Sequence, residues 1–423
     1  MKETYSMLTA QQALPSSIDF SEFRRGWHML VLAIVGVATS VSALLLYGFG
    51  AMVIPLQQAL GWARSDLQAA ITFMSIGAIV SSQAAGWLNA RYGLRTVTLC
   101  SLAALSLGFF GLTQIQGSIW SLYIGFMLIS LAGVGTLQIT WSELVNLWFE
   151  RNRGLALALI LSGTGIAAII LPPLVTWAVE RWSWKAGFIV MGLLPALAAL
   201  PLTMRWLHTT NPGSRSINKP SNGSAAALTG LSFKEAIRTG KFWRCNVALT
   251  LVVAAIVGMV TNTVPLLRDR GLSAQEAGHI FSSFGISLIL GRVVVGYLVD
   301  RFWAPGIAAI ALVLPAIGCI LFATAGTNVS LLVVATLLIG VGSGAEFDVA
   351  AFLVARYFGM RDYGRLFGVH LGLVTAGAAT SPLLFGAMYK ATGSYTAMLI
   401  FCFAAFAVGP LLLLTMGRYP KLT

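Results

Sequence analysis

Long apolar stretches separated by short polar breaks dominate this chain. The runs 27–60, 67–88 and 121–149 are each long enough to cross a bilayer as a helix, which takes about 20 residues. Dividing the chain at charged residues and at breaks containing Gly, Pro or Asn predicts twelve membrane-spanning helices. We expect them at 27–59, 66–90, 94–114, 118–149, 153–180, 184–206, 241–267, 274–300, 305–326, 329–357, 362–390 and 394–416. The pattern therefore predicts an all-α membrane protein.

One long polar segment interrupts this pattern near the middle of the chain. Residues 207–240 contain the stretch NPGSRSINKPSNGS, which is rich in Ser, Asn, Gly and Pro. Such a composition is typical of a flexible linker. We therefore expect a bundle of six helices at 27–206, a second at 241–416, and short polar tails at 1–26 and 417–423.

The charged residues exclude one class of protein and then fix the expected orientation of the chain in the membrane. Only 10% of the residues are charged and the mean hydropathy is +0.83, whereas a soluble protein carries roughly 25% charged residues. This composition excludes a large soluble enzyme. Most of the 27 lysines and arginines fall in breaks that share one side of the membrane if both termini are cytoplasmic, as the positive-inside rule requires. The net charge of +13 is thereby divided among short loops, so we expect a lipid bilayer and no nucleic acid as partner.

The four cysteines and the N-terminal segment add little to the functional prediction. The cysteines are neither paired nor in metal-ligand spacing, so we expect no disulfide, metal or cofactor. The first apolar run is longer than the 7–15 residues of a signal-peptide core, and no signal peptide is expected. The sequence predicts a multi-pass protein of the cell membrane, the inner membrane in a bacterium, which functions as a monomer.

The two halves repeat each other. GWLNARYGLR at 86–95 is matched by GYLVDRFWAP at 296–305, and SLYIGFMLISLAGVG at 121–135 by SLLVVATLLIGVGSG at 330–344. Single-residue matches include Pro55 with Pro265, Gly61 with Gly271 and Pro172 with Pro382. An offset that stays near 210 residues indicates one six-helix unit duplicated in parallel orientation. Two such bundles around a midplane cavity are typical of a transporter.

With twelve spans as six plus six and a Gly-x-Leu-x-Asp-Arg loop after spans 2 and 8, the chain resembles the major facilitator superfamily. The resemblance implies that Asp300 and Arg301 latch the cytoplasmic helix ends in the outward-open state, against Arg361, Arg365 and the start of span 11. The first copy has Ala90 in place of the Asp, so its latch is incomplete, with Asn89 as a substitute. The remaining residues of the two loop motifs are Gly86, Arg91, Arg95 and Gly296. Arg91 alone can also be explained as a basic residue that keeps its loop on the cytoplasmic side of the membrane.

Ionisable residues within spans carry the functional prediction, because lipid makes them costly. They are Glu143, Arg292, Glu346, Asp348 and His370. With a rise of about 1.5 Å per residue, Arg292, Asp348 and His370 lie about 12–14 Å from the cytoplasmic end, near the middle of a core about 30 Å thick. Each also has a structural explanation. Arg292 can neutralise Asp348 or Glu346, His370 can join two helices by a hydrogen bond, and Glu143 can belong to a cytoplasmic network with Arg151 and Arg153.

The functional alternative is proton-coupled anion transport. A guanidinium stays charged and matches a carboxylate, while a buried carboxyl or a His can carry a proton. SLILGRVVVGYLVDR resembles span 8 of the monocarboxylate porters and oxalate–formate antiporters, and YGFGAMVIPLQQALGWARSDL resembles their spans 1–2. The resemblance implies that Arg292 contacts a substrate carboxylate. Two positions differ from these porters, since Leu288 stands where they have an Asp and Ala51 where they have a Lys.

Three transport modes remain open: carboxylate symport, anion exchange and drug or metabolite efflux. Against efflux, span 4 lacks the Arg and span 5 the Gly-Pro signature of exporters, and Gly163 and Gly165 are explained by close helix packing. We expect uptake of a mono- or dicarboxylate or an aromatic acid together with protons. The further candidates for the substrate cavity are Tyr47, Gln138, Thr140, Trp141, Thr261 and Asn262.

Overall fold

The computed structural model describes residues 20–149, 153–207, 230–359 and 361–420, and within them it is all-helical apart from one isolated bridge between Gly230 and Gly359. The first half contains α1 (Phe20–Ala38), α2 (Val41–Leu60), α3 (Arg64–Tyr92), α4 (Leu94–Leu112), α5 (Trp120–Ala132), η1 (Gly133–Thr136), α6 (Gln138–Trp148), α7 (Arg153–Leu161), α8 (Gly163–Arg181), α9 (Trp184–Leu194), η2 (Pro195–Ala199) and α10 (Leu200–Trp206). The second contains α11 (Phe233–Ile237), α12 (Gly240–Asp269), α13 (Ala274–Arg301), α14 (Ala304–Thr324), α15 (Val329–Phe358), α16 (Tyr363–Thr392) and α17 (Thr396–Leu414). Among the described residues, twelve stretches are long and apolar enough to cross a membrane, which confirms the predicted fold class.

Several predicted spans are interrupted. The span expected at 27–59 is two helices, because Ser40 has extended backbone and its hydroxyl accepts a hydrogen bond from the Ala43 amide, which starts α2 afresh. The fourth span breaks at η1, where the amide of Gly135 donates to the Ser101 hydroxyl. Residues 208–229 of the predicted linker lie outside the described part. The last residues of the predicted linker form a helix instead of a flexible segment, since α11 starts at a capping box of Ser232 and Glu235.

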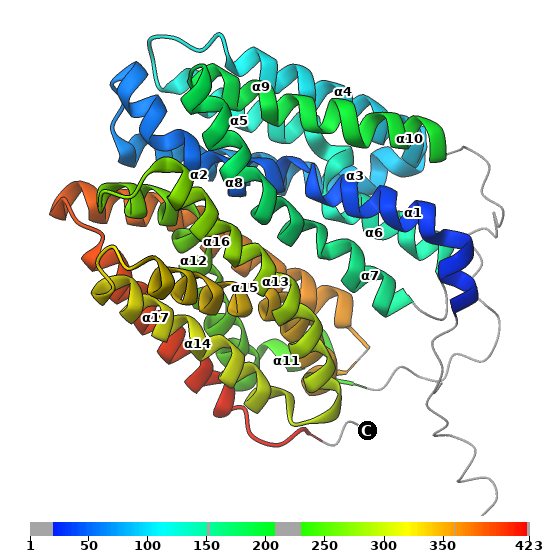
Figure 1. Cartoon of the computed structure of the whole chain (residues 1–423). Coiled ribbons are helices and arrows are strands. Elements are labelled where there is room, and N and C mark those ends of the chain that lie inside the picture. The colour runs from blue at the N-terminus through cyan, green and yellow to red at the C-terminus, as the bar shows by residue number, and fades with distance from the viewer. Residues whose placement is uncertain (1–19, 150–152, 208–229, 360, 421–423) are drawn as a thin grey trace, which may run out of the picture.

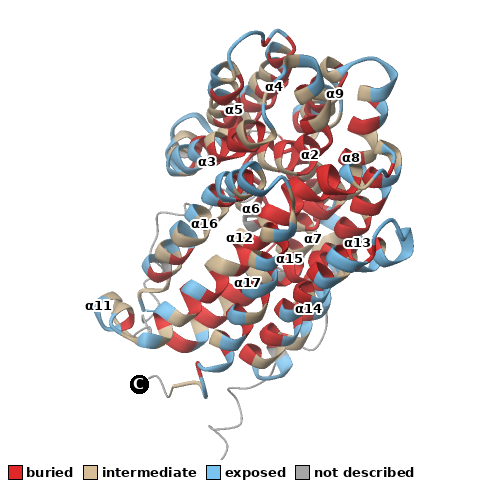
Figure 2. Ribbon diagram, turned by 90° about the vertical axis from the view of Figure 1, so that its left-hand side faces the viewer, coloured by how far each residue is buried: buried red, intermediate tan, exposed pale blue. Residues whose placement is uncertain are grey.

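The helices form two bundles, α1–α10 and α11–α17 (Figure 1). They meet mainly through three helix pairs, α8 with α13, α3 with α16 and α2 with α12. In Figure 1 the ribbons of α8 and α13 lie side by side near α2 and separate toward the opposite end. Figure 2 shows buried residues along the helices of this interface, including α2, α8, α12 and α13.

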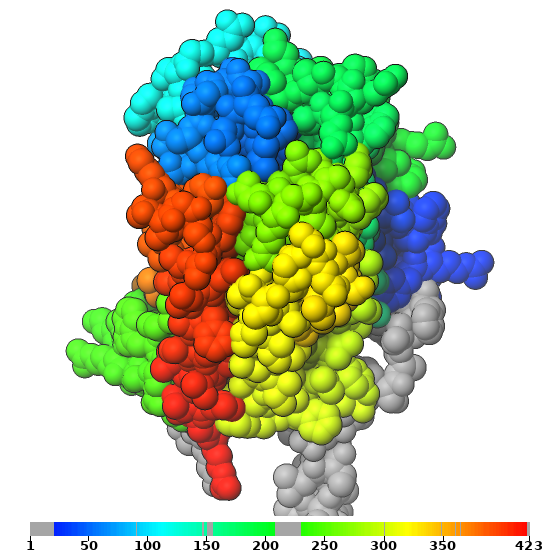
Figure 3. Space-filling model, turned by 60° about the vertical axis from the view of Figure 1, so that its left-hand side comes forward, coloured from blue at the N-terminus to red at the C-terminus, as the bar shows by residue number. Residues whose placement is uncertain are grey.

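The two ends of the molecule differ. One end, the Arg64 end, carries the start of α3 and the end of α12; the opposite end, the loop end, carries the repeated loops after Arg91 and Arg301. Toward the Arg64 end, side chains bond across the bundles: Gln68 to the Thr261 carbonyl at 3.1 Å and Thr72 to the Ala379 carbonyl at 2.6 Å. Figure 3 shows a continuous surface between the blue helices of the first bundle and the orange and yellow-green helices of the second. The structure is therefore closed at the Arg64 end.

Candidate functional site

Glycines bring α13 and α15 into backbone contact. A Cβ on Gly344 would lie 2.2 Å from the Leu288 carbonyl oxygen and 2.7 Å from the Arg292 amide, and one on Gly340 would lie 2.4 Å from the Phe284 carbonyl oxygen. Real side chains do not tolerate such distances, so only glycine lets the two helices approach this closely. The approach places the backbone of Arg292 against Gly344, two residues before Glu346 in the same helix.

Arg292 and Glu346 form the charged centre of the candidate site. Arg292 is only 8% exposed and interacts electrostatically with Glu346. Glu346 is half-buried as a residue, but its Oε2 atom is covered and has no hydrogen-bond partner among the described residues. An opposite charge nearby is what makes a buried carboxylate tolerable in a membrane span.

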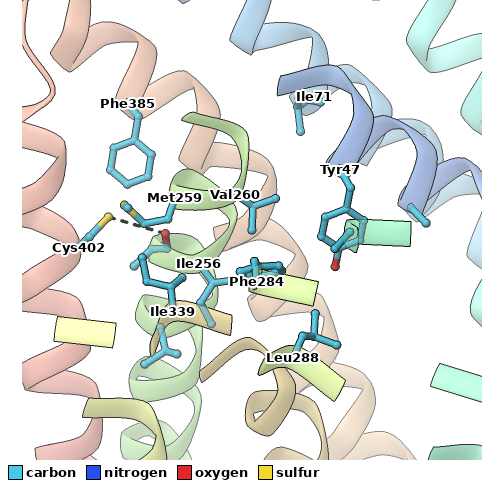
Figure 4. Packing of buried hydrophobic residues seen from close by; sticks show 14 of the residues in the cluster. Tyr47, Ile71, Ile256, Met259, Val260, Phe284, Leu288, Ile339, Phe385 and Cys402 are labelled. Carbon is cyan, nitrogen blue, oxygen red and sulfur yellow. Dashed lines mark hydrogen bonds between the residues drawn. The ribbon is translucent and has the colours of Figure 1, made fainter. Parts of the chain in front are cut away.

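Tyr47 reaches this centre from the other bundle. It projects from α2 toward Phe284 and Leu288 of α13, with the two aromatic ring centroids 6.1 Å apart (Figure 4). Its side chain interacts with Thr164 of α8 and lies in the electrostatic field of Arg292 and Glu346. The site thus combines a cation and an acid of one bundle with a phenol of the other.

His370 is not brought to this centre by any described contact. Its Nδ1 lies 2.8 Å from Oδ1 of Asn246 on α12. The amide nitrogen of Asn246 donates to the Phe242 carbonyl at 2.8 Å, so its oxygen accepts a hydrogen bond and His370 Nδ1 carries the proton. This geometry matches the hydrogen bond between helices weighed above. Asp348 lies on α15, and its side chain is outside the described part of the chain.

Of the polar candidates in the first bundle, Glu143 and Trp141 have structural partners. Glu143 accepts a hydrogen bond of 2.8 Å from the side-chain amide of Asn89, just before Ala90 of the first loop. Trp141 is fully buried against Gly36 of α1, and its Nε1 donates to the Thr136 carbonyl at 3.1 Å. The structure gives Trp141 a packing role instead of a place beside Arg292.

The other polar candidates lie on α6 and α12. Gln138 is exposed at the start of α6, directly after the break at η1. Thr140 is buried on the same helix. Asn262 is buried and donates to the Gly258 carbonyl and to the Thr261 hydroxyl, next to the small cavity at the Arg64 end.

The glycines of span 5 pack as predicted. A Cβ on Gly163 would lie 2.5 Å from the Ile34 carbonyl of α1, and one on Gly165 would lie 2.8 Å from the Gly285 carbonyl of α13. These contacts confirm that the two glycines permit close helix crossings, the second of them between the bundles.

The loop arginines contact their own bundles. Arg91 lies over the Trp87 ring at 5.4 Å and Arg301 over the Tyr297 ring at 4.3 Å, and Arg95 donates to the Met204 carbonyl. Gly86 and Gly296 have open space where a side chain would be. The Asp300 side chain lies outside the described part.

The predicted partners of Asp300 have other neighbours. Arg365 lies over the Phe233 ring of α11 at 5.3 Å and 4.0 Å from Asp362. Because Asp362 also accepts a hydrogen bond from the Phe233 amide, this group ties α11 to the start of α16.

Sequence reasoning missed the charged group that closes the Arg64 end. Arg64 forms an ion pair with Asp269 of the other bundle and hydrogen-bonds the hydroxyls of Tyr389 and Tyr395 at 3.2 and 3.4 Å. Beside it, Arg268 lies 3.9 Å from Glu180 of α8, at a cavity of about 390 Å³ between α2, α8, α12 and α13. The signal was present as charges at span ends, but 205 residues separate Arg64 from Asp269.

Comparisons with known proteins agree with this architecture. The family described as Major Facilitator Superfamily matches residues 35–302 and 248–422. Monocarboxylate transporter 13 of Bos taurus is 28% identical over 78% of this chain and 76% of its own length. The uncharacterized MFS-type transporter YhjX of Escherichia coli strain K12 is 25% identical over 71% and 74%. Monocarboxylate transporter 12 of Homo sapiens is 23% identical over 77% and 66%.

A solved structure shows the same fold. A mutant of the nucleoside transporter NupG matches 93% of this chain and 99% of its own length with a TM-score of 0.74 and 15% identity. These findings make the protein a multi-pass membrane transporter and not an enzyme. The chain belongs to the Major Facilitator Superfamily.

Proposed function

We propose that this secondary transporter carries a small organic anion together with a proton into the cell by alternating access. The anion is a mono- or dicarboxylate or an aromatic acid. The observation that carries the proposal is the buried Arg292 at the bundle interface, beside Glu346 and Tyr47. A guanidinium in a dry site binds a carboxylate through two parallel hydrogen bonds. Several relatives are named monocarboxylate transporters, which supports the same substrate class.

The proposed orientation places the loop end in the cytoplasm. Arg91, Arg301 and most other basic residues lie at that end, as the positive-inside rule favours. The closed Arg64 end then faces outward. Transport requires the contacts at this end to part, so that Arg292 becomes accessible from outside. When the bundles part at the loop end instead, the anion leaves to the cytoplasm.

Uptake into proteoliposomes tests the function. Labelled pyruvate, succinate and benzoate represent a monocarboxylate, a dicarboxylate and an aromatic acid, and protein-free liposomes correct for passive diffusion. With an inward proton gradient, symport accelerates uptake of at least one acid. Uptake that requires an internal counter-substrate indicates exchange instead, and indifference to all three acids favours efflux of other compounds.

The Arg292→Lys substitution tests the residue. Lysine keeps the charge but loses the two-pronged geometry, so we expect at least a tenfold loss of uptake. The control is Arg205→Lys, exposed in the last turn of α10 and outside both loop motifs, which should keep uptake within about twofold. Unchanged uptake of every accepted acid by Arg292→Lys contradicts the proposal.

A further inference from the structure

We propose that the cavity at the Arg64 end is a second binding site, which takes an aromatic monocarboxylate from the side of the membrane that this end faces. The cavity has a volume of about 390 Å³ and is lined by α2, α8 and the start of α9 from the first bundle and by α12 and α13 from the second. It is separate from the central site, because Arg292 lies about 27 Å along α13 from Ala274, which lines the cavity. Binding there does not depend on what the central site carries.

The shape of the cavity suits a small ligand that enters while the two bundles are closed on each other. Its exposed lining residues include Gln58 and Ser183, and its buried ones include Ala51, Thr176 and Val264. The cavity therefore has an open rim and a covered floor. Pockets that bind small molecules typically have volumes of about 300–1,000 Å³, so this cavity can hold an aromatic acid.

Arg268 supplies a cation whose hydrogen-bond donors are available. Its side chain is 31% exposed, and its Nη1 lies 3.9 Å from Oε1 of Glu180, whereas a charge-assisted hydrogen bond is about 2.7–2.9 Å long. Within the described part of the chain, the guanidinium donates no hydrogen bond, and Glu180 accepts one of 3.2 Å from Gln275 instead. The guanidinium can therefore bind a carboxylate through two parallel hydrogen bonds.

The other lining residues select the body of the ligand. Ile54 and Val179 give the cavity an apolar wall, and Trp184 adds an aromatic ring against which a second ring can pack edge to face. Lys185 lies 5.6 Å from the centre of that ring and adds a second positive charge nearby. Glu180 at the rim repels a second carboxylate on the ligand. One carboxylate on an aromatic body is therefore the chemistry that fits.

A ligand in this cavity joins the two bundles. Its carboxylate is held by Arg268 of α12, while its body lies against Ile54 of α2 and Val179 of α8. These walls face each other only while the Arg64 end is closed. Because a ligand shifts an equilibrium toward the state that it binds more tightly, an aromatic acid from this side keeps the end closed. In the orientation proposed above, it is an external inhibitor of the transport cycle.

Calorimetric titration of the full-length protein in detergent with benzoate measures binding at this site. The background is Arg292→Lys, which weakens carboxylate binding at the proposed central site. We expect benzoate still to bind this variant. Succinate carries a second carboxylate that faces the apolar wall and Glu180, so it should bind at least about tenfold more weakly.

Three substitutions in this background locate the ligand. Arg268→Gln removes the cation and should lower the affinity for benzoate at least about tenfold. Glu180→Gln keeps the size of the side chain and removes the competing charge, so it should raise the affinity about threefold or more. The control is Arg181→Gln, exposed at the end of α8 and outside the cavity lining, which should stay within about twofold because an exposed charge is screened. The gain expected for Glu180→Gln keeps the assignment testable even if Arg268→Gln folds poorly.

A distance measurement tests whether the ligand holds the bundles together. Spin labels at Gln116 and Lys390 lie at exposed positions of the two bundles near the Arg64 end. In a cysteine-free form of the same background, saturating benzoate should increase the population of the short distance. Arg268→Gln should abolish this response, and Arg181→Gln should retain it.

The site is excluded if benzoate does not bind Arg292→Lys, or if Arg268→Gln and Arg181→Gln weaken binding equally. An unchanged affinity in Glu180→Gln also excludes it, and succinate binding as tight as that of benzoate contradicts the ligand class. A longer distance in the presence of benzoate contradicts the joining of the bundles. Failure of the proposed function looks different, because the wild type then takes up no carboxylate while benzoate still binds and still responds to the substitutions at Arg268 and Glu180.

Discussion

Replacing Asp269 with Asn removes the carboxylate that joins the two bundles at the Arg64 end. In the wild type, Arg64 of α3 pairs with Asp269 of α12 and donates to Tyr389 and Tyr395 of the second bundle. Burial raises the pKa of Tyr395 above its ordinary value of 10.0, so this hydroxyl stays neutral at any working pH. The contact therefore stabilises the closed state of this end independently of moderate changes in pH.

The size of the effect follows from the exposure of the pair. The side chains of Arg64 and Asp269 are 17% and 28% exposed, between a buried and a surface pair. Surface ion pairs contribute about 0–1 kcal/mol, and hydrogen bonds to charged groups contribute about 1.5–3 kcal/mol. We expect Asp269→Asn to destabilise the closed state by about 1.5 kcal/mol. This corresponds to roughly a tenfold lower ratio of closed to open molecules.

Pulsed electron resonance between spin labels at Gln116 and Lys390 measures this ratio. Both positions are exposed, one in each bundle, near the Arg64 end. The four native cysteines are first replaced, namely Cys100, Cys245, Cys319 and Cys402. The distance distribution of Asp269→Asn should gain a longer component that is about ten times more populated relative to the short one than in the wild type.

Two controls decide the interpretation. Asp66→Asn removes an acid two residues from Arg64 that hydrogen-bonds its neighbour Ser65, and it should leave the distribution unchanged. The double variant Arg64→Asp with Asp269→Arg restores an opposite-charge pair and should recover most of the closed population. A ratio that changes less than twofold in Asp269→Asn would refute the reasoning.

Three further predictions concern packing and capping. Gly344→Ala forces a Cβ against a backbone carbonyl of α13, so it should lower the stability of the fold by about 1–3 kcal/mol. The measurement is the melting temperature in detergent, which should fall. Gly372 has open space where a side chain would be, so Gly372→Ala should melt like the wild type. Trp141→Phe loses the hydrogen bond of its indole to a buried carbonyl and should lower stability by about 1–3 kcal/mol, with no change in substrate affinity. The amide and hydroxyl of Ser232 lower the pKa of Glu235 from its ordinary 4.5, so the stability of α11 is present above that value and is lost as pH falls through the lowered pKa. The protection factors of the α11 amides, which compare the observed exchange rate with the intrinsic rate at the same pH, should therefore fall in acid in the wild type, and this fall should be smaller in Glu235→Gln.

The sequence by itself determined the architecture. The number of spans follows from the length of the apolar runs, because each helix must satisfy its own backbone in lipid. The repeat of 86–95 at 296–305 predicted two equivalent bundles, since duplicated segments fold alike. The resemblance of these segments to the Major Facilitator Superfamily was also sufficient to predict the family of the chain, and the comparisons confirmed that family. All of these are properties of segments that can be read without knowing their neighbours.

Only the tertiary structure decided which charged side chains meet. Position along a span gives the depth of a residue, but each residue turns a helix by about 100°, so the partner it faces depends on how neighbouring helices pack. Arg292, Asp348 and His370 were expected near the midplane, and Glu346 slightly deeper. Glycine contacts bring α13 against α15, so that Arg292 acts electrostatically on Glu346, while the rotation of α16 turns His370 to Asn246 of α12.

The same reason explains the contacts that join the two halves. The contribution of Tyr47 to a centre on the other bundle requires its ring to reach Phe284 of α13 across the interface. Arg64 and Asp269 each look like an ordinary charged helix end in the sequence, and 205 residues separate them. Their pairing exists only because the bundles close on each other at this end, a state of the assembled fold that no single segment specifies.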